Sequence, residues 1–154
     1  MTRWAEIEKE VPDLAVKARK LFDAGLHKTI ATLRRDGSPR LSGIECLFVD
    51  GDLWFGSMWQ GVKALDMQRD PRFVLHSSSP DQSEWEGDAK AAGKAEEITD
   101  PKRIKEIVTQ GPPGPVHLFR ADLTELVVVS VSADMKKLVI ESWHAGRGLS
   151  RRER

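Results

Sequence analysis

Apolar residues recur every three or four positions over the first two dozen residues, and this spacing predicts helix. The residues that share this helical face are Trp4, Ile7, Val11, Leu14, Ala18 and Leu21. Pro12 suits the first turn of a helix and not its interior. We therefore expect a short helix, a break near Val11 and a longer helix to about Ala24, with Gly25 as its stop. This N-terminal helical segment covers residues 1–25.

From His27 onward, short stretches of β-branched and aromatic residues alternate with turn signals. The stretch "KTIATL" (28–33) is followed by Asp36-Gly37, and "LSGIECLFV" (41–49) by Asp50-Gly51, both strong hairpin signals. A further apolar stretch, "LWFGSM" (53–58), follows directly. These three segments predict an antiparallel meander.

A helix is predicted after Ser57, and Pro71 ends it near Asp70. The stretch "RFVLHS" (72–77) resumes as a strand, and a polar loop leads into "AKAAGKAEEI" (89–98). This last strand alternates small residues with charged ones. Its nearly bare inward face either leaves space for a ligand or packs tightly at a barrel corner, and the pattern alone leaves both open.

The clearest helical pattern is "TDPKRIKEIVTQGPPG" (99–114), with Thr99 or Asp100 as the cap, Pro101 in the first turn and Gly111 as the stop. Two strands follow, "TELVVVSVS" (124–132) and "KLVIESW" (137–143), and the valine run predicts burial on both faces. The basic tail 144–154 is expected to be mobile. Six or seven strands joined by short turns, with helices between them, predict a mainly β fold, an antiparallel barrel with peripheral helices.

Composition narrows the function classes. The 154 residues are expected to form a single domain, and 24 basic side chains balance 24 acidic ones, which argues against a nucleic-acid partner. Cys46 is the only cysteine and the four histidines are scattered, so we expect neither a disulfide framework nor a metal site. No apolar run is long enough to cross a bilayer and the N-terminus is charged, so we expect a cytoplasmic protein without a membrane partner.

Sequence motifs of several enzyme classes are missing: no GxSxG elbow, no Walker loop and no GxGxxG after a strand occurs, so no catalytic residue is nominated. The stretch "SMWQGVK" (57–63) instead places a hydroxyl, a glycine and a lysine around the start of a helix. Free N–H groups and the helix dipole favour an anion there, and a bound anion would offset the unfavourable placement of Lys63. The alternative is an ordinary surface helix with a solvated lysine.

The order of these segments, the serine-to-lysine stretch that runs into "RDPR", and the closing "ESWHAGRGLSRR" resemble the pyridoxamine 5′-phosphate oxidase-like FMN-binding split barrels. This superfamily includes flavin and deazaflavin oxidoreductases, and the resemblance covers residues from about 26 to the C-terminus. It implies a homodimer that binds FMN, or the deazaflavin F420, at its interface and acts on a small-molecule substrate or electron donor. A flavin carrier or a haem-binding relative without turnover is the alternative.

The resemblance also nominates cofactor contacts. They are Arg40, Ser42, Gly43, Ile44, Ser57, Gln60, Gly61, Lys63, Asp88, Lys90, Trp143 and Arg147. Ser57 and Lys63 would hold the phosphate, the edge at residues 42–44 would face the isoalloxazine ring, and Asp88 and Lys90 would come from a second subunit. Pyridoxamine phosphate oxidases carry basic residues where this chain has Glu45 and Val62, so we do not expect their vitamin substrate.

Overall fold

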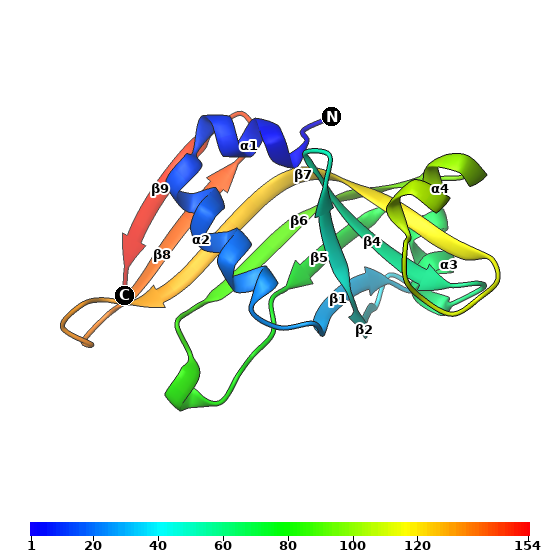
Figure 1. Cartoon of the computed structure of the whole chain (residues 1–154). Coiled ribbons are helices and arrows are strands. Elements are labelled where there is room, and N and C mark those ends of the chain that lie inside the picture. Colours follow the sequence, from blue (N-terminus) through cyan, green and yellow to red (C-terminus); the bar gives the residue numbers. More distant parts are fainter.

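An antiparallel sheet of nine strands forms the body of the protein, in a computed structural model that describes residues 1–154 (Figure 1). The strands are β1 (Lys28–Leu33), β2 (Pro39–Ile44), β3 (Cys46–Val49), β4 (Asp52–Met58), β5 (Arg72–His76), β6 (Asp88–Ile98), β7 (Val116–Val131), β8 (Leu138–His144) and β9 (Gly148–Glu153). The helices are α1 (Trp4–Glu10), α2 (Pro12–Asp23), α3 (Val62–Arg69) and α4 (Pro101–Ile107), with a short 3₁₀ turn at Gln82–Glu84. None of the helices has the length and apolar character that a membrane-spanning helix requires. The mainly β fold with peripheral helices is confirmed, with nine strands in place of the expected six or seven.

The barrel is closed by the chain itself. Neighbouring strands follow the order β2-β1-β5-β6-β7-β4-β3, so β2 and β3 lie at the two ends of this order. Only Glu45 separates them in the chain, and the predicted single strand 41–49 is divided there into two. The strand bends because its first half pairs with β1 and its second half with β4. Beside this bend β2 and β4 do not pair with each other, and the barrel is split there.

Strand β7 is sixteen residues long and joins the barrel to an arm of the sheet. It pairs with β6 along most of its length, with β4 near its start and with β8 near its end. The prediction that this strand starts at Thr124 is wrong. Residues 116–123 lack the continuous valine run that marks the rest of the strand, and they are extended because they pair with β4 on one side and β6 on the other. A bulge between Ala92 and Gly93 bends β6, and a Cβ at Gly93 would collide with the Asp122 carbonyl oxygen.

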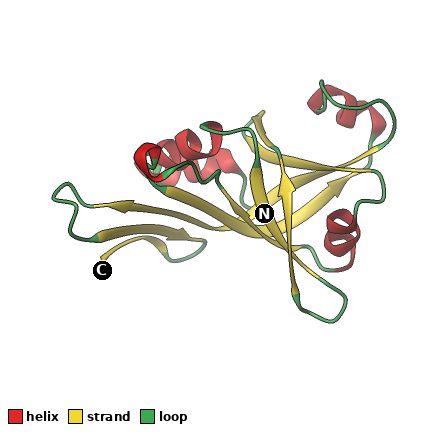
Figure 2. Cartoon of the chain, turned by 90° about the horizontal axis from the view of Figure 1, so that it is seen from below, coloured by secondary structure: helices red, strands yellow, loops and turns green.

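The C-terminal segment is a strand, which corrects the expectation of a mobile tail. Strand β9 pairs with β8 over residues 148–153, and the two strands extend from the barrel as an arm that ends at the C-terminus (Figure 2). Its arginines are exposed on an edge strand, where charge discourages pairing with other sheets.

The N-terminal prediction is confirmed: α1 and α2 break at Val11 and bury their shared face against the sheet. Helix α2 lies against β6 and β7, and the small residues of β6 provide the room for it. Ala89 and Ala91 are fully buried in the same cluster as Ala18. The bare face of this strand is therefore tightly packed against α2 and is not a ligand cavity.

Candidate functional site

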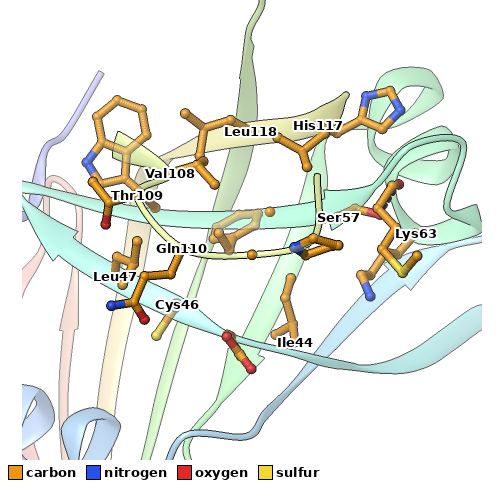
Figure 3. A pocket seen from close by; sticks show the side chains of 18 of the residues that line it. Ile44, Cys46, Leu47, Ser57, Lys63, Val108, Thr109, Gln110, His117 and Leu118 are labelled. Carbon is orange, nitrogen blue, oxygen red and sulfur yellow. Dashed lines mark hydrogen bonds between the residues drawn. The ribbon is translucent and has the colours of Figure 1, made fainter. Parts of the chain in front are cut away.

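A cleft of about 600 Å³ opens where the barrel splits (Figure 3). One wall is the bend between β2 and β3, from Ile44 to Leu47, and the floor is formed by β4 and the start of β7. The segment after α4, residues 108–112, passes over it. The sequence predicts that this segment is the end of a helix, but α4 ends at Ile107, and residues 108–112 are an irregular segment that lines the cleft. The volume of this cleft and its mostly apolar lining are typical of sites that bind small molecules.

The turn at residues 57–63, called here the 57–63 turn, forms the polar end of the cleft. Ser57 is the second-last residue of β4 and is largely buried, and Gly61 is the N-cap of α3. The first turn of α3 contains no acidic residue, and no side chain caps it. The amides of Val62 and Lys63 consequently have no acceptor, whereas those of the next two residues bond to the Gly61 carbonyl oxygen.

The other helices differ at this position. Glu6 and Asp13 lie in the first turns of α1 and α2, and the Asp100 side chain caps α4. Only α3 combines free amides with the partial positive charge of a helix N-terminus and no compensating acid. The same end also carries Lys63, so the 57–63 turn is locally electropositive.

The Lys63 ammonium connects this turn to the open edge of β2. Its Nζ donates to the Gly43 carbonyl oxygen at 3.0 Å, and it forms no ion pair with any carboxylate. Glu45, across the bend, is the only carboxylate that lines the cleft. Figure 3 shows Lys63 and Ser57 together at one end of the cleft, with Gln110 and Leu47 toward the other.

A buried carboxylate fixes α3 against the barrel. Asp66 is 2% exposed, and its Oδ2 accepts from Thr32 Oγ1 at 2.8 Å and from Arg40 Nε at 2.7 Å. Its Oδ1 accepts from an Arg69 guanidinium nitrogen at 3.0 Å. Burial raises the pKa of Asp66, but the hydrogen bonds from Arg40, Thr32 and Arg69 outweigh it and leave the pKa below its usual value. Arg40 thus forms its ion pair with Asp66 of α3 and does not line the cleft.

A second polar network, which the sequence did not reveal, lies behind the same turn. His117 is 2% exposed, with Nδ1 2.6 Å from Glu97 Oε1 and Nε2 3.2 Å from the backbone nitrogen of Gln60. The other Glu97 oxygen accepts from Gln68 Nε2 at 2.8 Å. Both ring nitrogens of His117 are occupied by these contacts, so neither is free to bind a haem iron.

Cys46 lines the cleft but is not poised as a nucleophile. Burial raises the pKa of its thiol to about 11, against a smaller lowering by the Lys28 charge. A thiol with this pKa is almost entirely protonated at neutral pH, and the reactive form of cysteine is the thiolate.

The structure brings part of the nominated set together. The nominated residues that line the cleft or belong to the 57–63 turn are Ile44, Ser57, Gln60, Gly61 and Lys63. Gly43 does not line the cleft, but its carbonyl oxygen accepts the hydrogen bond from Lys63. Ser42 lies on β2 on the same face as Arg40. Trp143 lies instead in the hydrophobic core, 1% exposed, and Arg147 lies in the turn between β8 and β9. The Trp143 side chain is therefore not available to a ligand in the cleft.

Asp88 and Lys90 lie on β6 and do not line the cleft. Cross-strand partners place Gly43, Thr29, His76 and Lys90 in one row over four strands. Residues directly opposite each other point to the same side of a sheet. In the adjacent row Leu41 is 72% exposed and Val74 40% exposed, although both are apolar. We call this surface the open face; α2 covers the other side of β6.

Comparison with solved structures gives close fold relatives at low identity. PhzG from Burkholderia lata 383, in complex with tetrahydrophenazine-1-carboxylic acid, aligns with a TM-score of 0.67 at 12% identity over 100% of this chain and 96% of that chain. A pyridoxamine 5′-phosphate oxidase-related, FMN-binding protein from Nostoc punctiforme PCC 73102 aligns with a TM-score of 0.63 at 14% identity over 96% of each chain. An F420 reductase aligns with a TM-score of 0.54 at 17% identity over 70% of this chain and 94% of that chain.

No family model matches the chain, and no curated protein sequence matches it. The solved structures therefore establish the fold: this chain has the split-barrel architecture of the pyridoxamine 5′-phosphate oxidase-related proteins, as the order of its segments predicts.

Proposed function

We propose that this chain is a homodimeric oxidoreductase that binds FMN, with the phosphate in the 57–63 turn and the ring system along the cleft. The observation that carries the proposal is the pair of unbonded amides at Val62 and Lys63, together with an ammonium group that has no carboxylate partner. A phosphate monoester supplies the acceptors and the negative charge that this arrangement lacks.

The choice between FMN and F420 rests on the charges around the cleft. F420 extends its phosphate into an acidic glutamyl tail, which calls for several cations along its path. Lys63 is the only lysine or arginine that lines the cleft, and Glu45 lies on the opposite wall. One lysine facing one glutamate can compensate the single phosphate of FMN better than the several negative charges of the F420 tail. FMN is therefore preferred, and F420 is the alternative.

The backbone at the split would accommodate a flat ring. Gly43 on β2 has open space where a Cβ would stand, so a planar ligand can approach this strand closely. Gly56 on β4 lines the cleft without a side chain, and residues 108–112 line its other side. A bound flavin would supply the hydride transfer, and the protein would bind, orient and shield it.

A second copy of this chain is proposed to cover the open face. The row from Gly43 to Lys90 spans three strand spacings, or about 14 Å. A copy that packs there would bring its own Asp88 and Lys90 toward the β2 edge of the first. Exposed apolar residues on this face, such as Val74 at its centre and Leu41 on its edge strand β2, are typical of such a contact.

Cofactor binding is tested by titrating FMN, riboflavin, F420 and haem separately into the purified protein. FMN should bind more tightly than riboflavin, which lacks the phosphate, and Lys63→Ala should weaken FMN by roughly tenfold or more while leaving riboflavin within about twofold. The matched control is Lys102→Ala, because Lys102 is the second residue of α4 as Lys63 is of α3, but Asp100 caps that helix.

The outcomes separate the alternatives. Exclusive F420 binding would keep the site and change the cofactor, a Soret band would favour the haem-binding reading, and no binding of any ligand would reject the proposal. A flavin-loaded protein that is reduced by a nicotinamide and reoxidised by an acceptor is an oxidoreductase. One that is never reduced is a carrier.

The dimer is tested by light scattering after gel filtration. Val74→Glu places a charge at the centre of the open face and should give monomers. Val16→Glu, at a residue that is 69% exposed on α2, should not change the mass. A monomeric wild-type protein would refute this part of the proposal.

A further inference from the structure

We infer that His117, oriented by Glu97, holds the 57–63 turn in the conformation that binds an anion, and is thus a positioning residue. The ligand in this inference rests on the proposed function, whereas the conformation of the turn can be tested without any ligand.

The 57–63 turn depends on an unfavourable backbone conformation. Gln60 has φ +60°, a left-handed value that residues other than glycine adopt infrequently. This reversal directs the chain from Met58 into Gly61, so that α3 begins with its free amides at the cleft. Two hydrogen bonds hold this conformation: the Gly61 amide donates to the Met58 carbonyl oxygen at 3.0 Å and closes the turn, and the Gln60 amide donates to His117 Nε2. Only the bond to His117 joins the Gln60 backbone to a residue outside the turn.

The position of His117 is well defined by its surroundings. It pairs with Ser57 across β4 and β7, directly at the base of the turn. The Trp59 ring stacks on the imidazole with centroids 4.5 Å apart and planes 5° from parallel, and Phe119 lies beyond at 6.4 Å. The imidazole is therefore fixed in place between Trp59 of the turn itself and the core.

The two hydrogen bonds of His117 agree on one tautomer. A Glu97 carboxylate can only accept, so Nδ1 carries the hydrogen and donates to Oε1 at 2.6 Å. The neutral ring then has its lone pair on Nε2, which accepts the Gln60 N–H at 3.2 Å. Glu97 thus selects the ring form that can hold the turn, in the way outer carboxylates orient metal-binding histidines.

The network also reaches the helix that the turn begins. Gln68, near the end of α3, donates to the second Glu97 oxygen at 2.8 Å. One carboxylate on β6 therefore holds the turn through His117 and the helix through Gln68. Both ends of the segment that presents the Val62 and Lys63 amides are fixed to the same point.

This arrangement makes a selective prediction. His117 donates nothing to the cleft, because both ring nitrogens are used, so it acts on the anion only through the backbone of the turn. Its loss should weaken ligands that carry a phosphate and leave the same ring system without a phosphate unaffected.

The first test uses the ligand-free wild-type protein. Long-range ¹H–¹⁵N correlation should show the Nδ1–H tautomer of His117, and the Gln60 amide should exchange with solvent at least about tenfold more slowly than an unbonded loop amide. The Nε2–H tautomer or an unprotected Gln60 amide would overturn the inference. Neither result depends on whether FMN is the ligand.

The second test compares FMN and riboflavin affinity. His117→Ala should weaken FMN by roughly tenfold and riboflavin by less than about twofold, as expected for one lost hydrogen bond at a strained turn. Glu97→Gln keeps an acceptor for Nδ1–H and should lose less than about threefold, and His27→Ala, at an exposed histidine whose ring makes no hydrogen bond, should lose nothing.

Equal losses for FMN and riboflavin would mean that His117 is merely part of the wall, and unchanged affinities would mean that it does not hold the turn. Either result overturns the inference. If wild-type protein does not prefer FMN to riboflavin, the proposed function fails while the tautomer and exchange measurements still decide the role of His117. They also decide it if His117→Ala does not fold.

Discussion

Replacing Asp66 by asparagine tests whether α3, and with it the 57–63 turn, is held on the barrel by a buried carboxylate. The side chain is isosteric, so packing is preserved while the negative charge and one acceptor are lost. Asp66 accepts hydrogen bonds from two arginines and from the buried Thr32 hydroxyl, and α3 has otherwise only Ala64 and Met67 in the core.

The magnitude follows from the exposure of the partners. Removing one member of a fully buried ion pair costs about 3–5 kcal/mol, because the other charge is left unpaired. Here the Arg40 and Arg69 side chains are 25% and 32% exposed, so water partly replaces the carboxylate. We expect the free energy of unfolding to fall by about 2 kcal/mol. For a chain of 154 residues this lowers the melting temperature by about 6 °C.

The assay is urea unfolding at pH 7, with a lower midpoint and an unchanged slope. Asp70→Asn is the control, since Asp70 pairs with a largely exposed Arg72 at the end of the same helix, and it should change the free energy of unfolding far less than Asp66→Asn does. A loss for Asp66→Asn no larger than that for Asp70→Asn would refute the reasoning.

The pH dependence gives an independent check. The pKa of Asp66 is lowered in the folded protein, so its contribution is fully present above the unfolded value of about 4 and is lost as the pH falls through the folded pKa. The stability gap between wild-type protein and Asp66→Asn should be constant between about pH 5 and 8 and narrow below about pH 4. A gap that stays constant at every acidic pH at which the protein is folded would contradict this account.

Three further predictions concern single positions. Gly93→Ala places a methyl group against the Asp122 carbonyl oxygen at the bulge and should lower the free energy of unfolding by at least about 2 kcal/mol; a melting point within about 2 °C of wild type would contradict this. Gly61→Ala drives a methyl group into the Ser57 hydroxyl and should weaken FMN more than riboflavin, whereas equal effects would argue against a phosphate contact at Ser57. Cys46, with its pKa of about 11, should react with iodoacetamide at pH 8 far more slowly in the folded protein than in urea, and equal rates would show that the thiol is not buried.

The sequence predicted correctly those elements whose structure depends on residues that are close together in the chain. The apolar face of the N-terminal helices, the break at Pro12 and the Asp100 cap of α4 all lie within a few residues of the structure they specify, and each is confirmed. The 57–63 turn was also found this way. A serine at a strand end and a lysine in the next helical turn are near neighbours in sequence and in space.

The errors fall where pairing is decided by distant residues. Strand β9 reads as a charged tail, because its basic side chains are exposed and only its backbone pairing with β8 makes it a strand. The bend at Glu45 has no turn residue to announce it, since it arises from the competition of β1 and β4 for one stretch of chain. The strand propensities of the residues therefore predict neither the pairing of β9 nor the bend at Glu45.

The contacts of His117 could have been predicted from the sequence only by combining information from distant segments. Gln60 and Glu97 lie 57 and 20 residues away from it in the chain, so no local motif joins them. Had β7 been extended back to Val116, the alternation of side chains would have placed His117 on the same inner face as Phe119. A histidine on an inner face must find partners for both ring nitrogens, because an unpaired buried polar group is costly. The only segments that can supply them are the strands on either side of β7 and their ends, and these are β6, with Glu97, and β4, with the turn that follows it. The alternation of side chains along β7 and the need of a buried imidazole for two hydrogen-bond partners therefore together connect His117 with the turn that we propose binds the phosphate.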